Sequence, residues 1–386
     1  MTACQTRTNP EDSDNIAAVE NENTLAVGGA LMQIIDADGH INDHARGEEI
    51  AAYMPKGNQL TKVFPEFDHL HFRYLKQHRH PTGNPSPDDW NQFLDKTEIA
   101  WTVLYPTAGL AVGRIMARDW AVLACKAYNT WLYEKFLNRN PRLRGVALIP
   151  FQDVDYAILE LRRAVTELGM VGGMLPSNGE AIQGHLGNKI YWPLYEEAQK
   201  LGCALAVHVG CLHHLGLDSF ATYYPAHALG HPFSLMVQAA AMLAHGVFDR
   251  FPKLRLAFLE GGATWVPFMM DRLDRSYHEG HKQLDLDGEL IGGPKNGQKA
   301  SDYFKTHLRN GRIFVGFDCD DDGLSTAVAK GGRQSFLFGS DYPHEVFDAA
   351  KCRHEIDELL GREDLTEADK AAVLGGNALR FYQPGL

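Results

Sequence analysis

Residues of the kinds that bind divalent metals follow four strand-like apolar runs of this chain. In chain order they are Asp38 with His40, then His208, then Glu260, then Asp341. A buried strand is apolar, so a chargeable residue directly after it lies at a rim, where a ligand can reach it. Carboxylates and imidazoles that converge from several strand ends can hold one divalent ion with a water bound to it. The pattern therefore predicts a site for one metal ion.

The first pair has a spacing that suits a shared ion. Side chains two residues apart in a strand face the same side, so Asp38 and His40 can reach one metal, and Asp36 lies one layer deeper on that face. The ordinary alternative is an aspartate that caps the next turn beside a surface histidine. For His208 the alternative is a core histidine that binds no ligand, and the metal interpretation rests on the other strand ends.

Asp341 and Glu260 are the predicted catalytic residues. Both are carboxylates after strands that open on one mouth, so they can serve as a proton donor and a proton acceptor around one bound group. Asp341 could also bind the metal while it gives or accepts a proton. The alternative for Asp341 is an N-cap of the helix that is expected near Val346.

Alternating strand and helix patterns predict which elements position these residues. Strands are expected at Gln33–Ala37, Trp101–Tyr105, Gly145–Ile149, Val171–Leu175, Ala204–Val207, Leu254–Leu259, Arg312–Gly316 and Ser335–Phe338. Helical spacing is expected at Arg114–Arg139, Val154–Leu168, Pro193–Leu201, Pro232–Phe248, Trp265–His281, Ser301–His307, Leu324–Ala329, Val346–Leu360 and Glu367–Phe381. This alternation predicts an α/β fold, a (β/α)8 TIM barrel whose strand ends meet at one mouth. A doubly wound sheet is the alternative, but no glycine-rich phosphate loop follows any strand.

The domain organisation follows from the segments outside these units. Residues 1–30 are expected to be a flexible N-terminal tail, because Thr2–Thr24 is polar and acidic and lacks the apolar segment of a signal sequence. Residues 31–386 are expected to form a single barrel domain. The long polar and aromatic stretch Asp43–Asn91 follows the first strand, so it is expected to be a loop insertion over the mouth.

Composition excludes several classes of partner. A formal net charge of −12 argues against nucleic acid and anionic membranes, and no apolar run approaches the length of a membrane span. Six scattered cysteines without a C-x-x-C pair are expected to be reduced thiols. We therefore expect a cytoplasmic protein with a small-molecule substrate.

Several short sequences resemble those of the amidohydrolase-related family 2, and the resemblance extends from about residue 34 to residue 382. They are Phe251–Arg255, Glu260–Gly262, Gly339–His344 and Gly376–Tyr382. The resemblance implies a (β/α)8 barrel with one divalent metal, Zn²⁺ or Mn²⁺, and a homo-oligomer such as a dimer. Carried over by position, it implies Asp38, His40, His208 and Asp341 as metal ligands.

The chain departs from that family pattern at two positions. Family members commonly begin with His-x-His or Glu-x-His, whereas this chain has Asp38, a shorter and harder ligand that favours a harder ion such as Mn²⁺. The sixth strand commonly ends in a histidine, and here it ends in Glu260, a general base, a further ligand or a carboxylate bonded to backbone amides. Arg73, His227 and His344 are expected to contact the carboxylate substrate.

Three functions are consistent with these features. The first is metal-dependent decarboxylation of a small carboxylated aromatic or muconate-like acid, with Asp341 protonating the carbon. The second is metal-dependent hydrolysis of an amide, a lactone or an activated C–C bond, with Glu260 deprotonating a metal-bound water. The third is a scaffold barrel without activity, which the retained ligand set argues against.

Overall fold

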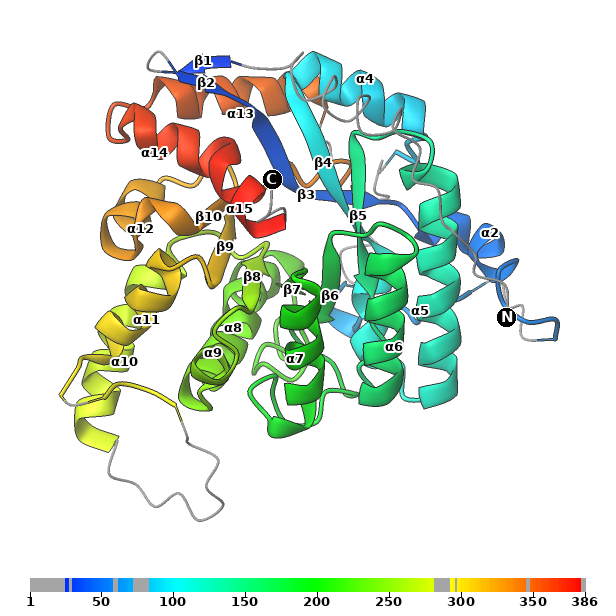
Figure 1. Cartoon of the computed structure of the whole chain (residues 1–386), viewed down its shortest axis with the longest axis horizontal. Helices are drawn as coiled ribbons and strands as arrows, with labels where there is room; N and C mark the ends of the chain where they lie inside the picture. The colour runs from blue at the N-terminus through cyan, green and yellow to red at the C-terminus, as the bar shows by residue number, and fades with distance from the viewer. Residues whose placement is uncertain are drawn as a thin grey trace, which may run out of the picture.

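The computed structural model describes the strands and helices that surround the predicted site. The described residues are 25–27, 30–57, 62–71, 83–280, 292–295, 297–344 and 348–382. The parallel sheet consists of β3 (Ile34–Ile41), β4 (Ile99–Pro106), β5 (Leu143–Leu148), β6 (Gly172–Pro176), β7 (Ala204–His208), β8 (Arg255–Leu259), β9 (Ile313–Phe317) and β10 (Phe336–Phe338). These eight strands confirm the eight that the sequence predicts, and each pairs with its neighbour in chain order (Figure 1).

The barrel closes between its first and last strands, next to the predicted site. His40 N donates to Tyr342 O over 2.7 Å, and Asp341 N donates to Asp38 O over 3.0 Å. These two hydrogen bonds join β3 to the segment that follows β10. The predicted (β/α)8 barrel is confirmed, and the seam of the barrel holds three of the predicted ligands.

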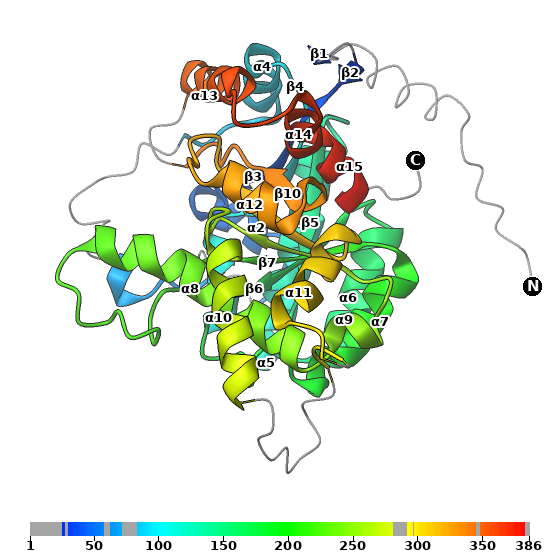
Figure 2. The ribbon, with the colours of Figure 1, turned by 90° about the vertical axis from the view of Figure 1, so that its left-hand side faces the viewer.

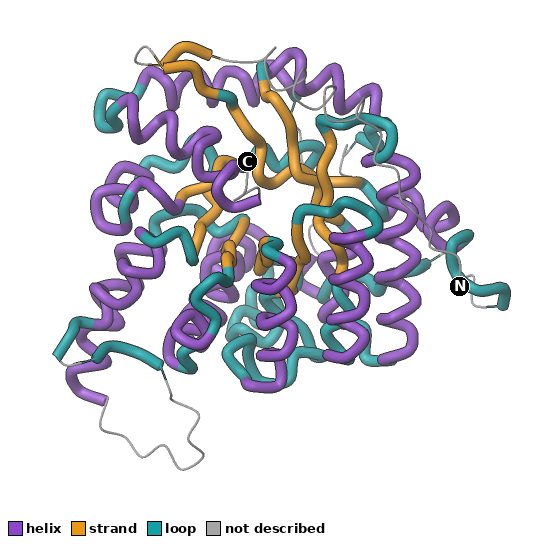
Figure 3. Tube along the Cα trace, in the orientation of Figure 1, coloured by secondary structure: helices purple, strands orange, loops and turns teal. Residues whose placement is uncertain are grey.

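Helices surround the strands (Figure 3). They are α2 (Gly47–Ala51), α4 (Pro87–Thr97), α5 (Arg118–Leu132), α6 (Val154–Thr166), α7 (Trp192–Leu201), α8 (Tyr223–Ala244), α9 (Val247–Arg250), α10 (Trp265–Gly280), α11 (Ala300–Arg309), α12 (Leu324–Gly331), α13 (Ala349–Gly361), α14 (Glu367–Ala371) and α15 (Asn377–Tyr382). Local signals explain several starts. Asp153 caps α6 by accepting from Tyr156 N, and Ser86 with Asp89 forms a capping box ahead of Pro87.

Three helices differ from the sequence prediction. The helix expected at Glu367–Phe381 is divided into α14, a π-helical turn at Ala372–Gly376 and α15. The segment expected to be one helix at Arg114–Arg139 is divided into a 3₁₀ segment that ends at Arg114, the helix α5 and a π-helical turn at Tyr133–Leu137. Helix α8 begins at Tyr223 and contains Pro232, which was expected to start it. The proline removes one N–H donor inside the helix, but nine preceding residues already form helical turns.

The insertion after β3 is partly helical and reaches the mouth. It contains α2 and the first residues of α4, and the carboxylate of Asp68 accepts from the backbone N–H groups of Leu212 and His213, which follow β7. Its expected position over the mouth is consistent with these bonds. Residues 72–82 lie outside the described residues.

The N-terminal region contains a short pair of strands. β1 (Leu25–Val27) and β2 (Ala30–Met32) are antiparallel, and residues 1–24 lie outside the described residues. Within the described part of the chain, no helix is long and apolar enough to cross a membrane. Of the six cysteines, the five in the described ranges are free and buried, as expected for reduced thiols.

Candidate active site

Four of the predicted residues meet at the mouth of the barrel. His208 Nε2 lies 3.1 Å from Asp38 Oδ1, and His40 Nε2 lies 3.5 Å from the same oxygen. Asp341 Oδ1 lies 3.3 Å from His40 Nε2. The strand β3 contributes Asp38 and His40, β7 contributes His208, and the turn after β10 contributes Asp341. The structure therefore brings together the four side chains that the sequence predicted as metal ligands.

Backbone carbonyls fix both histidine rings. His40 Nδ1 lies 3.0 Å from Pro106 O, and His208 Nδ1 lies 2.8 Å from Val209 O. A carbonyl only accepts, so Nδ1 carries the proton in each ring and a neutral ring has its lone pair on Nε2. Metal-binding histidines commonly have this second hydrogen bond, which orients the ring toward the ion.

Two buried atoms at the centre of this cluster make no hydrogen bond of good geometry, although Asp341 Oδ1 forms an ion-pair contact of 2.8 Å with His344 Nδ1. They are His40 Nε2 and Asp341 Oδ1, which face each other at 3.3 Å. Buried polar atoms are nearly always satisfied, so a pair left without hydrogen bonds needs an explanation. A divalent cation between them would satisfy both, and it would also relieve the close approach of Asp38 Oδ1 to His208 Nε2. The residues present therefore fit one divalent metal.

The electrostatics of the cluster favour the ligand forms of these groups. Burial raises the pKa of Asp38, but the neighbouring His208 and His40 outweigh burial and hold it well below its usual range. Burial lowers the pKa of His40, and His344 lowers it further. Burial also acts to raise the pKa of Asp341, while His344 and then His40 lower it. At neutral pH, Asp38 and Asp341 are carboxylates and His40 is a neutral base.

Asp36 supports the ligands from one layer below, as the strand pattern predicted. Its carboxylate accepts from Thr102 Oγ1 at 2.6 Å, from Ser340 N at 2.8 Å and from Ser340 Oγ at 2.7 Å. These bonds tie β3, β4 and the residue before Asp341 together. Gly39 leaves room for this layer, because a Cβ there would lie 2.5 Å from Thr102 Oγ1.

Asp341 and Glu260 have left-handed backbones, with φ values of 54° and 64°. Such angles are uncommon for residues other than glycine, and they concentrate at functional sites. Asp341 Oδ1 lies 2.8 Å from His344 Nδ1, and Thr107 Oγ1 holds the other ring nitrogen of His344 at 2.8 Å. His344, predicted to bind substrate, thus contacts the carboxylate of Asp341.

Glu260 lies beside His208. Its Oε2 is 3.5 Å from His208 Nδ1, which is the ring nitrogen opposite the one that faces Asp38. Glu260 therefore contacts the cluster through the ring of His208. This placement favours a positioning role for Glu260 over direct coordination.

The remaining predicted residues have different outcomes. His227 lies in the first turns of α8, where its ring centroid is 4.0 Å from that of His231 and 5.1 Å from that of Tyr223. It was expected in a loop, and Pro225 near the start of α8 is the sequence signal that could have located the helix. Arg73 lies outside the described residues.

Two residues that lie at the mouth of the barrel were not predicted from the sequence. Asp318 directly follows β9, and it is close enough to Asp341 and Asp320 for their charges to act on it. The rule that identified the other strand ends applies to it equally. Tyr105 lies near the end of β4, and its ring centroid is 5.1 Å from that of His208. Because its neighbours in sequence are apolar, the sequence did not mark it as a site residue.

Comparisons with known proteins agree with this geometry. The amidohydrolase family model (Amidohydro_2) matches residues 35–383. The chain belongs to this family. Because the match covers the whole barrel and the ligand cluster, the chain is an enzyme of the amidohydrolase superfamily, as the resemblance implied.

Curated relatives of this chain catalyse two kinds of reaction. It is 28% identical over 248 residues to the 2-amino-3-carboxymuconate-6-semialdehyde decarboxylase of Dictyostelium discoideum. The match covers 64% of this chain and 62% of that enzyme, which is less than two thirds of its length. It is 28% identical over 265 residues to γ-resorcylate decarboxylase of Polaromonas sp., covering 66% and 74% of the two chains. It is 23% identical over 383 residues to 2-keto-4-carboxy-3-hexenedioate hydratase of Sphingobium sp., covering 91% and 96%.

A solved structure agrees on the fold. The dihydroxybenzoic acid decarboxylase of Polaromonas sp., crystallised with manganese and the inhibitor 2-nitroresorcinol, superposes with a TM-score of 0.62 at 21% identity. The superposition covers 92% of this chain and 98% of that one. At this identity the likeness supports the barrel fold.

Proposed function

We propose that this protein is a metal-dependent decarboxylase that removes CO2 from a small aromatic or muconate-like carboxylic acid. The observation that carries the proposal is a pair of possible metal-binding groups that share His40, one with Asp38 and His208 and the other with Asp341 and His344. The decarboxylases among its relatives supply the reaction class. A divalent ion held by the four predicted metal ligands would bind and polarise the substrate's carboxylate.

The chain's own residues supply the proton. Asp341 lies at the centre of the cluster and shares a short contact with His344, whose ring Thr107 holds from the other side. A proton can therefore pass from His344 to the carboxylate of Asp341. During decarboxylation the C–C bond to the carboxylate would break, CO2 would leave, and the electron pair left on carbon would take the proton that Asp341 has received from His344. No oxidant or reductant is needed.

The metal is proposed to be Zn²⁺ or Mn²⁺. Two imidazole nitrogens are ligands that Zn²⁺ accepts readily, while two carboxylates shift the set toward the harder Mn²⁺. Elemental analysis of the purified protein is expected to find about one of these ions for each chain. Reconstitution of chelated protein with each metal in turn would identify which ion restores CO2 release.

Substitutions at the two carboxylates test the mechanism. Asp341→Asn is expected to abolish CO2 release from 2,6-dihydroxybenzoate or the true substrate while His40, His208 and Asp38 retain part of the metal. Glu260→Gln is expected to change turnover less, because Glu260 contacts His208 from the side away from Asp38. An Asp341→Asn enzyme with normal turnover would exclude Asp341 as the proton donor.

A reaction that uses water is the second candidate, either hydrolysis or addition to a double bond. The long match to a hydratase favours it, and Glu260 would then be the base. In that case Glu260→Gln should lower turnover by roughly 10²–10⁴-fold, the usual scale for one general base. Incorporation of solvent ¹⁸O into product, without release of CO2, would establish this reaction and exclude decarboxylation.

The same proposal includes a homodimer formed through α8. Leu229, Phe233 and Val237 are exposed at a spacing of four residues, so they form one apolar stripe on α8, which extends away from the strands (Figure 2). Light scattering is expected to give twice the mass of one chain, and Phe233→Asp is expected to give monomers. Leu159→Asp, at a single exposed leucine on α6, is the matched control.

A further inference from the structure

Outside the candidate active site, three possible metal ligands meet at the rim of the barrel. They are Glu180, His213 and His214, and one ligand atom of each lies within 4.8 Å of the others. Glu180 follows β6, and the two histidines follow β7. Because β6 and β7 are parallel, both segments leave the sheet at the edge where the barrel has its mouth. We call these three residues the rim site.

The ring of His213 is held in the way that metal-binding histidines commonly are. It is buried, and its Nδ1 lies 3.3 Å from Asp68 Oδ2, an oxygen that the backbone N–H groups of Leu212 and His213 also fix. A carboxylate only accepts, so Nδ1 carries the proton and the neutral ring has its lone pair on Nε2. Asp68 therefore orients this ring as backbone carbonyls orient His40 and His208.

The contact between His213 and Glu180 is not a hydrogen bond. His213 Nε2 lies 3.1 Å from Glu180 Oε1, yet this buried nitrogen has no hydrogen-bond partner. At so short a distance, the oxygen must lie well away from the direction in which the ring nitrogen points. Two ligands of one Zn²⁺ lie side by side in this way, because tetrahedral bonds of about 2.1 Å place their atoms roughly 3.4 Å apart.

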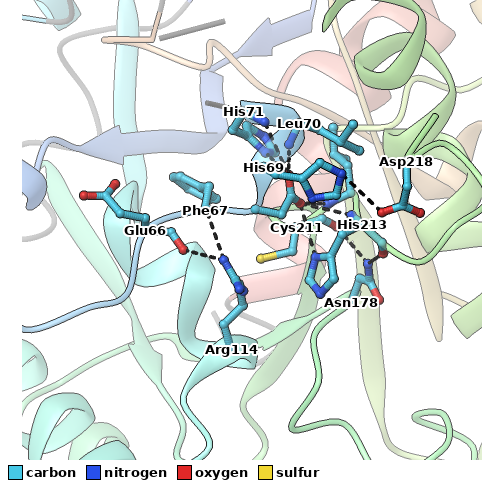
Figure 4. Close-up of polar contacts among 12 residues, drawn as sticks. Glu66, Phe67, His69, Leu70, His71, Arg114, Asn178, Cys211, His213 and Asp218 are labelled. Atoms are coloured by element: carbon cyan, nitrogen blue, oxygen red, sulfur yellow. Dashed lines mark hydrogen bonds and ion pairs between the residues drawn. The ribbon is translucent and has the colours of Figure 1, made fainter. Parts of the chain in front are cut away.

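His214 lies on the same side of the loop as His213. Its backbone is left-handed, with φ 62°, and its ring centroid is 4.5 Å from that of His213. Asn178 fixes the loop by donating to Cys211 O at 3.1 Å and to His213 O at 2.7 Å (Figure 4). The two neighbouring rings are therefore held together beside Glu180 before any ion binds.

The charges around the rim site favour a cation. The carboxylates of Asp68 and Glu180 contact the two nitrogens of the His213 ring. Arg114 offsets part of this charge, but it lies 3.4 Å from the oxygens of Glu180, whereas its Nη1 donates to two carbonyls of the insertion at 2.9 Å (Figure 4). The neighbouring group of Asp68, Cys211 and His213 is a weaker candidate for an ion. Its carboxylate is already satisfied by backbone N–H groups, and burial raises the pKa of the Cys211 thiol.

We propose that the rim site binds a second divalent ion, Zn²⁺, through Glu180, His213 and His214. Two imidazoles and one carboxylate are ligands that Zn²⁺ accepts, and water completes four-coordination. The ion joins the segments after β6 and β7 to the insertion, because Asp68 of the insertion holds the ring of His213. Glu180 and His214 are exposed, so this ion exchanges with solvent and is lost on dialysis. It is additional to the ion of the candidate active site and does not depend on decarboxylation.

Calorimetric titration with Zn²⁺ tests the inference. Full-length protein is first loaded with Zn²⁺ and dialysed, so that the weakly held ion is removed. Further Zn²⁺ at about pH 7.5 is expected to bind at one ion for each chain, and more weakly at about pH 6, where it must displace a proton from His213. No uptake of further Zn²⁺ up to about 1 mM would overturn the inference. A protein that releases no CO2 from any acid can still give either result.

Two exposed ligands and one control locate the ion. Glu180→Gln and His214→Gln are each expected to weaken binding of the further Zn²⁺ by about tenfold or more, the scale seen even for second-shell groups. His354→Gln is the matched control, because His354 is also exposed and lies 3.5 Å from a glutamate, Glu358, but belongs to no group of three possible ligands among the described residues. It should bind the further Zn²⁺ as the wild type does. Unchanged binding in folded Glu180→Gln and His214→Gln would place the ion elsewhere and overturn the inference.

Discussion

Two clusters of aspartate and histidine satisfy their polar atoms differently. The metal cluster consists of the proposed ligands Asp38, His40, His208 and Asp341, and the Asp68 cluster consists of Asp68, His71 and His213. In the metal cluster, His40 Nε2 and Asp341 Oδ1 are buried and have no hydrogen-bond partner. In the Asp68 cluster, the carboxylate accepts from four backbone N–H groups as well as facing His71 and His213. His213 Nε2 is also buried without a hydrogen bond, and Asp68, Cys211 and His213 are close enough to hold an ion, so the two clusters differ in how their carboxylates are satisfied and not in whether every atom is.

The position of each cluster explains this difference. The proposed metal ligands lie on β3, on β7 and directly after β10, so strands hold their side-chain atoms 3.1–3.5 Å from one another in the pairs described above. Asp68 instead joins two loops, the insertion and the segment after β7, whose backbone N–H groups have no strand partner there. A carboxylate that collects such donors fastens the loops without any ligand.

The largest effect is expected when one buried histidine of each cluster is replaced in turn. His208→Ala should remove most of the bound metal and reduce turnover to background, because it deletes a nitrogen ligand from the centre of the cluster. His213→Ala should leave about one metal ion for each chain. Elemental analysis of both variants after dialysis measures this difference. Full metal content in His208→Ala would remove His208 from the ligand set.

The next effect is on stability. Asp68→Asn should lower the free energy of unfolding by about 3 kcal/mol, because it leaves buried donors with a neutral and partly mismatched partner. Its metal content should stay at the wild-type level. Asp218→Asn, in an exposed pair with His69, should cost less than about 0.5 kcal/mol. Urea unfolding of chelated protein gives both values, and a loss of metal in folded Asp68→Asn would contradict the separation of the two clusters.

Most of the barrel could be predicted from the sequence, because each apolar run is buried on both faces and must be a strand. The ligands were predictable for the same reason, since each follows such a run. The Asp68 cluster was not, because its members lie far apart in sequence and meet only through the fold of the insertion. Nor was the helical setting of His227, because Pro232 suggested a helix start although the helix already extends from Tyr223.

Glu260 illustrates a further limit of sequence reasoning. Its place after β8 predicted that it would face the mouth, and the structure puts its carboxylate 3.5 Å from His208 Nδ1. Which side of the histidine ring it would contact depends on the left-handed backbone at Glu260, and no pattern of residue types specifies that angle. Whether Glu260 is placed as a base or as a positioning group could therefore be judged only from the structure.

The pH dependence of the two clusters should differ in sign above neutrality. The hydrogen bond to Asp68 raises the pKa of His213, so the stability from this pair is complete below the ordinary histidine pKa of about 6.5 and is lost as pH rises above it. The neighbouring histidines outweigh burial and hold the pKa of Asp68 far below its usual range, so its contribution is lost only in strong acid. The proposed metal binding by His40, in contrast, needs a neutral ring, and burial lowers the pKa of His40.

Melting temperatures measure this difference directly. For chelated protein, the difference in melting temperature between wild type and His213→Gln should be largest near pH 5.5 and should narrow by about 1–2 °C toward pH 8.5, because one unit of pKa shift is worth about 1.4 kcal/mol and a chain of this length shifts by roughly 1 °C for each kcal/mol. Metal affinity of the wild type should rise over the same interval. A difference in melting temperature that widens with pH would show that His213 acts as a neutral partner of Asp68.

The smallest effect is expected from removing residues 1–24, a change that should leave both clusters as they are. This segment is polar and acidic, so it lacks the apolar side chains that would have to be buried against the barrel to stabilise it. The segment that begins at β1 keeps every residue named in either cluster. A protein that starts at Leu25 should therefore match the full chain in metal content, turnover and melting temperature. Loss of turnover with the melting temperature unchanged would mean that the segment contributes to the mouth, and loss of both would mean that residues 1–24 belong to the folded domain.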